Sequence, residues 1–470
     1  MTTPREYAVD LLVRAQPLIS TDPNMAYQML TSAVAADPLF AAGWASLGGA
    51  LADLGVIVAS CEAYRTALRL DDGGGPGDMT PALRRRCLLQ LGHRLTHQRI
   101  ITWERIGEAW DCLTRAAMMP GEFDPQETAF IHTNMSLISG HWGNADAEMW
   151  HAKEGFRVHP DPTTELGLAF ACLYQGCYAE GLEHFEARFP YSLKSYEAYP
   201  APRWDGGYVE KLFVLIEQGL GDALSFARFL PLAASGVGEL IYPVQPSLVR
   251  LIAAAVSHVP NIRVVPQDRV IERGDAWVPA PSLPLALGLT DARIRDTPGL
   301  PVRVKPVEDT SWKRKDARLH VAIAWAGAAG NGIDAQRSIP FIEFLALRAV
   351  PGIALYSVQV GERGADLHNT GCSALVRDLT GWIHDANDTA GILMEMDAVV
   401  TCESFVGHLA GLLHKRCYLM VSRFGRDWRS SVSLGGDRAA LWYENTKVIR
   451  QGDDVDWRPC FKRVVEDLKQ

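Results

Sequence analysis

A glycine-rich turn follows an apolar stretch near the middle of the 470-residue chain. The apolar run 212–216 leads into Glu217, the glycines Gly219 and Gly221, and Asp222. Glycines at such a turn let the backbone approach a ligand closely, and the helix that follows presents unpaired N–H groups. As a general base, the carboxylate of Asp222 would accept a proton from an attacking hydroxyl group. It would equally serve as the N-cap of the helix, and the turn by itself favours that common use.

A second polar loop is expected after the apolar run 319–325. It carries Arg337 and Ser338. A guanidinium group binds a diphosphate through two parallel hydrogen bonds, so Arg337 is a candidate ligand for the phosphates of a nucleotide. The alternative is an exposed, solvated arginine without a ligand, and the local sequence favours that alternative.

A third group lies at the start of a helix predicted near 404–414. Ser404 stands where a side chain caps a helix, which would leave the other N–H groups of the first turn directed at an anion. His408 follows four residues later and therefore lies on the same face. Glu403 places a carboxylate beside the cap. Taken alone, His408 is typical of an ordinary helix histidine.

The composition is that of an ordinary globular protein, with 48% hydrophobic and 21% charged residues. A formal net charge of -9 provides no global field for nucleic acid, which is therefore not an expected partner. The nine cysteines include no Cys-x-x-Cys pair, which argues against a zinc ribbon and fits a reducing compartment. No signal peptide or long apolar run is recognisable, so we expect a cytoplasmic protein without membrane insertion.

Helical repeats are predicted for residues 1–190. The clearest repeat covers 37–70, where small and aromatic residues recur at offsets that resemble the tetratricopeptide pattern. These residues are Trp44, Leu47, Gly48, Leu51, Gly55, Tyr64 and Ala67. A single hairpin cannot bury its apolar face and must stack on neighbours, which are expected at 81–118, 129–160 and 163–190. An irregular helical bundle is the alternative.

At about Lys211 the pattern changes to short apolar runs that alternate with helices, which is typical of parallel sheets covered on both faces. Two such domains are predicted, at 205–305 and 317–470. The predicted strands are 212–216, 239–243, 262–265, 276–278, 319–325, 353–359, 397–401 and 417–421. Because ligands bind beyond the carboxyl ends of parallel strands, a cleft is expected where the two domains meet.

An ordered set of motifs in residues 165–460 resembles a bacterial family of tetratricopeptide-repeat glycosyltransferases related to the heptosyltransferases. The opening motif is 219–231. The other matching positions are Gly181, 185–189, Trp204, Gly206, Trp325, Gly327, Asp334, 337–339, 388–390, Asp397, 408–411, 427–429, 442–443 and 450–451. The resemblance implies tetratricopeptide-like helical repeats followed by a GT-B pair of Rossmann-like parallel-sheet domains.

The resemblance also implies a site. In the heptosyltransferase relatives the Asp of the opening motif is the proposed catalytic base, a role that falls to Asp222 here. The family normally has Asp-Thr where this chain has Glu403 and Ser404, and a carboxylate displaced by one bond length matters for catalysis. The donor would be held by Gly219, Gly221, Arg337, Ser338, Glu403, Ser404 and His408. His408 is also the second candidate catalytic residue.

Together these features predict a metal-independent, inverting transfer of a sugar from a nucleotide-sugar to a hydroxyl group, without any other cofactor. Helix N–H groups and Arg337 would stabilise charge on the leaving nucleotide. Tetratricopeptide arrays mostly bind polypeptide, so the expected acceptor is Ser or Thr of a protein such as flagellin or a surface protein. One alternative is a polysaccharide, lipopolysaccharide or modified nucleic-acid acceptor. The other is a catalytically inactive repeat scaffold, which the change at Glu403 and Ser404 favours.

Overall fold

The computed structural model of the chain falls into two compact units, Met1–Thr164 and Glu165–Gln470. The residues it describes are 3–74, 78–98, 100–192, 199–217, 219–269, 273–302, 304–328, 330, 334–429, 438–440 and 442–470. Among these residues, no helix is both long enough and apolar enough to cross a membrane.

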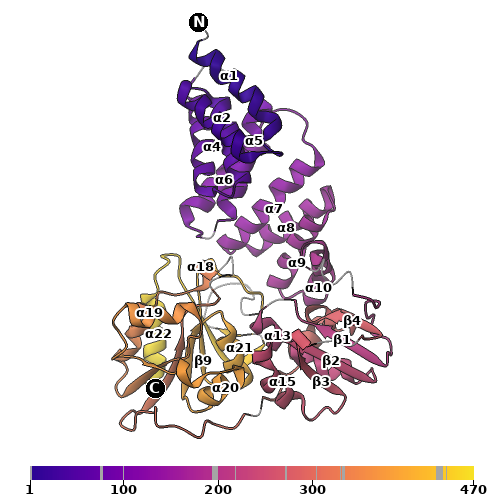
Figure 1. Cartoon of the computed structure of the whole chain (residues 1–470), viewed down its shortest axis with the longest axis vertical. Coiled ribbons are helices and arrows are strands. Elements are labelled where there is room, and N and C mark those ends of the chain that lie inside the picture. Colours follow the sequence, from indigo (N-terminus) through magenta and orange to yellow (C-terminus); the bar gives the residue numbers. More distant parts are fainter. Residues whose placement is uncertain are drawn as a thin grey trace. The chain divides into compact units, whose positions relative to one another are not determined.

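The first unit consists of helical hairpins, drawn from indigo to magenta in Figure 1. Successive helices pack in pairs: α1 (Pro4–Ala15) with α2 (Pro23–Ala36), α3 (Ala41–Asp53) with α4 (Ile57–Asp72), α5 (Pro81–Thr96) with α6 (Trp103–Ala117), and α7 (Pro125–Trp142) with α8 (Ala145–Val158). A glycine permits close packing within the second pair, because a Cβ on Gly48 would lie 2.8 Å from the ring of Tyr64. The tetratricopeptide-like hairpins predicted from the sequence are confirmed.

Four histidines lie between α5, α7 and α8 of this unit. The ring of His93 is 4.2 Å from that of His97, and the Nδ1 atoms of His132 and His151 are 2.9 Å apart. Burial lowers the pKa of His93, His132 and His151, and it lowers the pKa of His93 and His151 to about 4. Neighbouring charges contribute less: Arg94 also lowers the pKa of His93, whereas Glu154 raises that of His132. The side chains of His93, His132 and His151 are therefore packed as neutral imidazoles, whereas His97 is exposed to solvent.

The first unit is expected to lose stability as the pH falls from 6.5 toward 4. In that window the unfolded chain binds protons at His93 and His151, whose ordinary pKa is 6.5, while the folded chain does not. The free energy of unfolding therefore rises with pH across the window. Urea denaturation of the full chain at several pH values, followed by helical circular dichroism, measures it. The variant His93→Gln/His151→Gln should show a shallower pH dependence, and an unchanged slope would contradict the assignment.

The second unit contains two sheets. The four-stranded sheet has the order β3-β2-β1-β4, with β1 (Lys211–Leu215), β2 (Glu239–Val244), β3 (Ile262–Pro266) and β4 (Ala276–Pro279), all parallel. The seven-stranded sheet has the order β10-β11-β9-β8-β5-β6-β7. Its strands are β5 (Leu319–Ala324), β6 (Ile353–Ser357), β7 (Arg377–Asp378), β8 (Ala398–Cys402), β9 (Cys417–Val421), β10 (Arg438–Ala440) and β11 (Tyr443–Arg450). Only the pairing of β10 with β11 is antiparallel among these described strands. The predicted combination of helical repeats and two Rossmann-like parallel sheets is confirmed.

Two helical segments of the second unit are irregular. The helix that follows the glycine turn is divided into α13 (Leu220–Phe226), a 3₁₀ turn η3 (Ala227–Phe229) and α14 (Leu230–Ala234). Pro231 explains the division, since proline lacks an N–H and its ring clashes with the carbonyl four residues earlier. The segment η7 (Phe341–Ala349) is a 3₁₀ helix rather than an α-helix.

The structure has further helices besides the four-residue α11 (Phe189–Ser192). They are α9 (Pro162–Tyr174), α10 (Tyr178–Phe185), α15 (Val249–Val256), α16 (Leu283–Ala286), α17 (Asp291–Asp296), α18 (Asp334–Arg337), α19 (Ala365–Asn369), α20 (Ala386–Met394), α21 (Phe405–Leu412) and α22 (Arg458–Leu468). Helix α10 packs on α16 and α17. One hydrophobic core includes buried residues from both sheets, and α13 packs against α21 within it.

Candidate functional site

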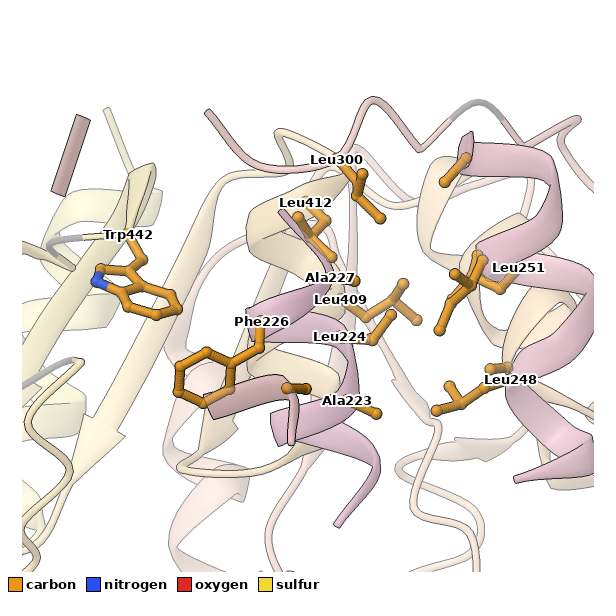
Figure 2. Close-up of a cluster of buried hydrophobic side chains, with 14 of the residues drawn as sticks. Ala223, Leu224, Phe226, Ala227, Leu248, Leu251, Leu300, Leu409, Leu412 and Trp442 are labelled. Atoms are coloured by element: carbon orange, nitrogen blue, oxygen red, sulfur yellow. The ribbon is translucent and has the colours of Figure 1, made fainter. Parts of the chain in front are cut away.

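The helices that follow the first strand of one sheet and a central strand of the other pack against each other. Helix α13 follows β1, and α21 follows β8. A Cβ on Gly221 would lie 2.7 Å from the ring of His408, so only glycine allows the two helices this close approach. Figure 2 shows the apolar side chains beside this contact, with Leu224 of α13 and Ala227 of η3 close to Leu409 of α21.

Asp222 does not cap its helix. The N-cap position of α13 is occupied by Gly219, and no side chain makes a capping hydrogen bond there. Instead, the Asp222 carboxylate accepts a hydrogen bond from Nη1 of Arg429, in the segment after β9. The capping alternative weighed for Asp222 is therefore wrong. Asp222 is the residue through which α13 makes an ion pair with the segment from the other sheet.

Arg429 was noted in the sequence only as part of a motif, and its contact with Asp222 was missed. Its Nη1 also donates to the hydroxyl of Ser225 at 3.0 Å, and its Nη2 donates to Asp427 at 2.8 Å. Burial would lower the pKa of the Arg429 guanidinium, but the carboxylates of Asp427 and Asp222 raise it well above its ordinary value. Burial would likewise raise the pKa of Asp427, but Arg429 outweighs it and holds that pKa below the ordinary value.

His408 lies beside this ion pair as a half-buried, neutral imidazole. Its Nδ1 lies 3.1 Å from the hydroxyl of Tyr443. Burial, and secondarily the charge of Arg429, lowers the pKa of His408 to about 4. At neutral pH the ring of His408 therefore carries no positive charge, and it packs against Gly221 and Tyr443.

The start of α21 differs in one respect from the prediction. Ser404 does occupy the N-cap position, but its side chain makes no capping hydrogen bond and its Oγ lies 3.0 Å from Oγ1 of Thr401. The expected cap is therefore wrong. The physical reason is local competition, because the hydroxyl of Thr401 at the end of β8 is within reach. The consequence is that Ser404 caps none of the first-turn N–H groups of α21.

Glu403 lies next to this helix start, close to a segment that follows β9. A Cβ on Gly425 would be 2.8 Å from Oε2 of Glu403. Burial lowers the pKa of Arg450, and the nearby Glu403 carboxylate opposes that effect. Nη1 of Arg450 donates to the carbonyl of Gly425 at 2.9 Å. Glu403 therefore belongs to a charged group at the carboxyl ends of β8, β9 and β11.

Arg337 and Ser338 lie in the loop after β5, where the buried Asp334 organises the backbone. Asp334 Oδ1 accepts hydrogen bonds from the amide of Gly327 and the hydroxyl of Ser338, both at 2.9 Å. The guanidinium of Arg337 lies against Gly327, where a Cβ would clash with its Nη2, and its Nε is 3.6 Å from Asp334. The Arg337 side chain is 21% exposed, so the solvated, exposed arginine of the alternative is not what the structure shows.

The loop after β5 and the start of α21 lie near one another. Burial raises the pKa of the Cys402 thiol to about 12, and among the charges that act on it are Arg337 and Glu403. Ser422, after β9, donates to the backbone carbonyl of Gln336. The structure thus gathers two groups of predicted residues: Asp222, Gly221 and His408 at the helix contact, and Arg337 and Glu403 at the strand ends of the seven-stranded sheet.

The sequence contains one Asp-x-Asp triplet, Asp454-Val455-Asp456. It lies in the loop before α22. The Asp456 carboxylate is paired with Arg458 at 2.7 Å, and Asp454 accepts from the backbone N–H of Asp456 at 3.2 Å. No cluster of three or more His, Cys, Asp or Glu side chains suited to a metal occurs in the described parts of the chain.

Comparisons with known proteins give partial likenesses. No family model matches the chain. Protein FlbA of Caulobacter vibrioides is 22% identical over 360 residues, which are 70% of this chain and 59% of FlbA, so the chain spans less than two thirds of that relative. The solved ADP-heptose LPS heptosyltransferase II of E. coli is 13% identical, with a TM-score of 0.38, over 55% of this chain and 97% of that one. PilF of Pseudomonas aeruginosa is 18% identical, with a TM-score of 0.31, over 39% and 76%.

Proposed function

We propose that the chain is a glycosyltransferase that moves a sugar from a nucleotide-sugar to a hydroxyl group. The observation that carries this proposal is the packing of two helices against each other, each of which follows a parallel strand. One presents the carboxylate of Asp222, and the other, at Ser404, lacks a side-chain cap. A carboxylate can accept a proton, and uncapped N–H groups attract an anion. These are the two requirements for transferring a sugar from a diphosphate leaving group.

In the proposed reaction, Asp222 takes the proton from the acceptor hydroxyl. The oxygen then forms a bond to the anomeric carbon while the bond from that carbon to the diphosphate breaks. The N–H groups at the start of α21 and the guanidinium of Arg337 stabilise the negative charge on the departing diphosphate. Attack opposite the leaving group inverts the configuration of the anomeric carbon. The proposed reaction uses no metal or other cofactor.

The acceptor is proposed to be Ser or Thr of a polypeptide held by the helical repeats. The repeats are proposed to occupy residues 1–190, and the two Rossmann-like domains residues 205–305 and 317–470. Stacked helical hairpins form an extended surface suited to a peptide. Flagellin or a surface protein glycosylated in a bacterial cytoplasm before export is the proposed case. A polysaccharide, lipopolysaccharide or modified nucleic acid is the alternative acceptor.

The competing proposal is an inactive scaffold, and the observation in its favour is Glu403 with Ser404 where the resembling family has Asp-Thr. Incubation with a panel of nucleotide-sugars separates the two. Thermal shift reports donor binding, and slow release of the nucleoside diphosphate reports hydrolysis in the absence of acceptor. An enzyme should show both with one donor, whereas a scaffold should show no release with any.

Replacing Arg337 by Ala is expected to weaken nucleoside diphosphate binding by about 10- to 100-fold, the usual effect of losing hydrogen bonds to a charged group. Calorimetry with UDP, GDP, ADP and dTDP, with and without a chelator, measures it. Arg348→Ala is a suitable control, because Arg348 is exposed on η7 and donates to the backbone carbonyl of Leu375 at 3.2 Å. Binding that disappears with chelator would contradict the metal-free proposal, and unchanged binding by Arg337→Ala would contradict the role of that residue.

A further inference from the structure

The tripeptide Asp-Trp-Arg occurs twice in the chain, at 427–429 and 456–458. Both copies form the same local clasp. In the first, Asp427 accepts from the backbone N–H and from Nε of Arg429, both at 2.9 Å, and from Nη2 at 2.8 Å. In the second, Asp456 accepts from the backbone N–H of Arg458 at 3.0 Å, from Nε at 2.7 Å and from Nη2 at 2.7 Å. The clasp fixes the plane of the guanidinium and leaves Nη1 unused.

The two copies differ in what surrounds the unused Nη1. The Arg458 side chain is 83% exposed, whereas the Arg429 side chain is 14% exposed. Nη1 of Arg429 donates to Oδ1 of Asp222 and, at 3.0 Å, to Ser225, one turn along α13. The first clasp is therefore directed at one face of α13, and the second is directed at solvent.

The tryptophan between Asp427 and Arg429 anchors the clasp to α13. Trp428 is 8% exposed, and its ring lies 6.3 Å from Phe226 of α13 and 5.3 Å from Trp442. Trp428, the central residue of the clasp, is thus held by packing and not by the ion pair alone. A guanidinium placed in this way approaches Asp222 in one orientation.

We infer that Arg429, held by Asp427, is a positioning residue that fixes the carboxylate of Asp222 for proton transfer. The inference rests on the proposed function. By binding Oδ1, Arg429 leaves Oδ2 as the oxygen that accepts a proton, and no hydrogen bond to Oδ2 is found among the described residues. Oδ2 faces the glycine turn, 3.9 Å from where a Cβ of Gly219 would be. Without Arg429 the Asp222 side chain would sample other rotamers, and a displacement of about 1 Å costs about 10²-fold in rate.

The test compares the two clasps in the full-length chain. Arg429→Ala is expected to lower kcat about 10²-fold, with the KM for the nucleotide-sugar within a few-fold of wild type. Millimolar guanidinium chloride should restore part of that kcat, because it replaces the missing group at Asp222. Asp427→Asn should lower kcat less, without rescue. The matched controls Arg458→Ala and Asp456→Asn remove the same local clasp where it is exposed, and they should leave kcat unchanged.

Each other outcome overturns the inference in a recognisable way. A wild-type kcat in Arg429→Ala removes the positioning role. A KM raised more than tenfold with unchanged kcat would show that Arg429 binds the donor. A loss of kcat with lower thermal stability and no guanidinium rescue would show that Arg429 only stabilises the fold. If Arg429→Ala does not fold, Arg429→Lys keeps the charge but not the clasp, and it should lose about tenfold in kcat; full activity there overturns the inference. A wild-type chain without turnover on any donor would contradict the proposed function itself. A wild-type kcat for Arg429→Ala, together with an inactive Asp222→Asn variant, would contradict the inference alone.

Discussion

Replacing Asp222 by Asn is expected to reduce sugar transfer by about 10²–10⁴-fold while donor affinity stays within a few-fold. The amide has the size of the carboxylate and can still accept a hydrogen bond from Arg429, but it cannot take a proton from the acceptor. The helix should be unaffected, because the N-cap of α13 is Gly219 and Asp222 makes no capping bond. Turnover at saturating donor, together with calorimetry for the nucleotide, measures both halves of the prediction.

Asp296→Asn is a suitable control for that experiment. Asp296 lies at the end of α17, its side chain is 63% exposed and its ion-pair partner is Arg295. Its replacement should leave turnover unchanged. An Asp222→Asn protein that folds, binds donor and keeps near-native turnover would show that the base lies elsewhere, and His408 would be the next residue to replace.

Replacing Arg188 by Met is expected to destabilise the second unit by about 3–5 kcal/mol, the usual cost of removing one partner of a buried ion pair. Nε and Nη2 of Arg188 bind both carboxylate oxygens of Glu217 at 2.7 and 2.8 Å, and Nη2 also donates to Ser282 at 2.8 Å. The side chains of Arg188 and Glu217 are 4% and 1% exposed. The substitution would leave the Glu217 carboxylate buried without its cation, directly after β1. Urea denaturation followed by tryptophan fluorescence measures the loss.

The double variant Arg188→Met/Glu217→Leu tests the cause of that loss. It removes the charges of Arg188 and Glu217. Glu186 loses its contact with Arg188 but keeps its ion pair with Arg203. Much of the lost stability should therefore return, since buried ion pairs are often replaceable by apolar side chains of similar volume. Arg458→Met, which breaks an exposed pair with Asp456, should change the free energy of unfolding by no more than about 0.5 kcal/mol. A double variant no more stable than Arg188→Met would contradict the buried-charge explanation.

Most of the fold was predictable because its elements follow local patterns. The buried strands β1, β5, β8 and β9 are continuous apolar runs, and a run of that kind indicates a parallel strand without any knowledge of its neighbours. Strand β11 was not predicted. Its residues alternate irregularly between buried and exposed and include Glu444, Asn445 and Lys447, so its sequence lacks the apolar run of a central strand. The two-residue strand β7 is too short to leave a pattern.

The sequence by itself determined the kinds of groups at the candidate site and their order along the chain: a glycine turn with Asp222, a later loop with Arg337, and a helix start with Ser404 and His408. It also determined the Asp-Trp-Arg clasps, because each is made by residues two positions apart. Only the tertiary structure decided which partner each group meets. Arg429 is 207 positions from Asp222, and the contact depends on α13 and α21 packing through Gly221. Such a contact forms because two sheets pack in one core. A short stretch of neighbouring sequence does not contain that information.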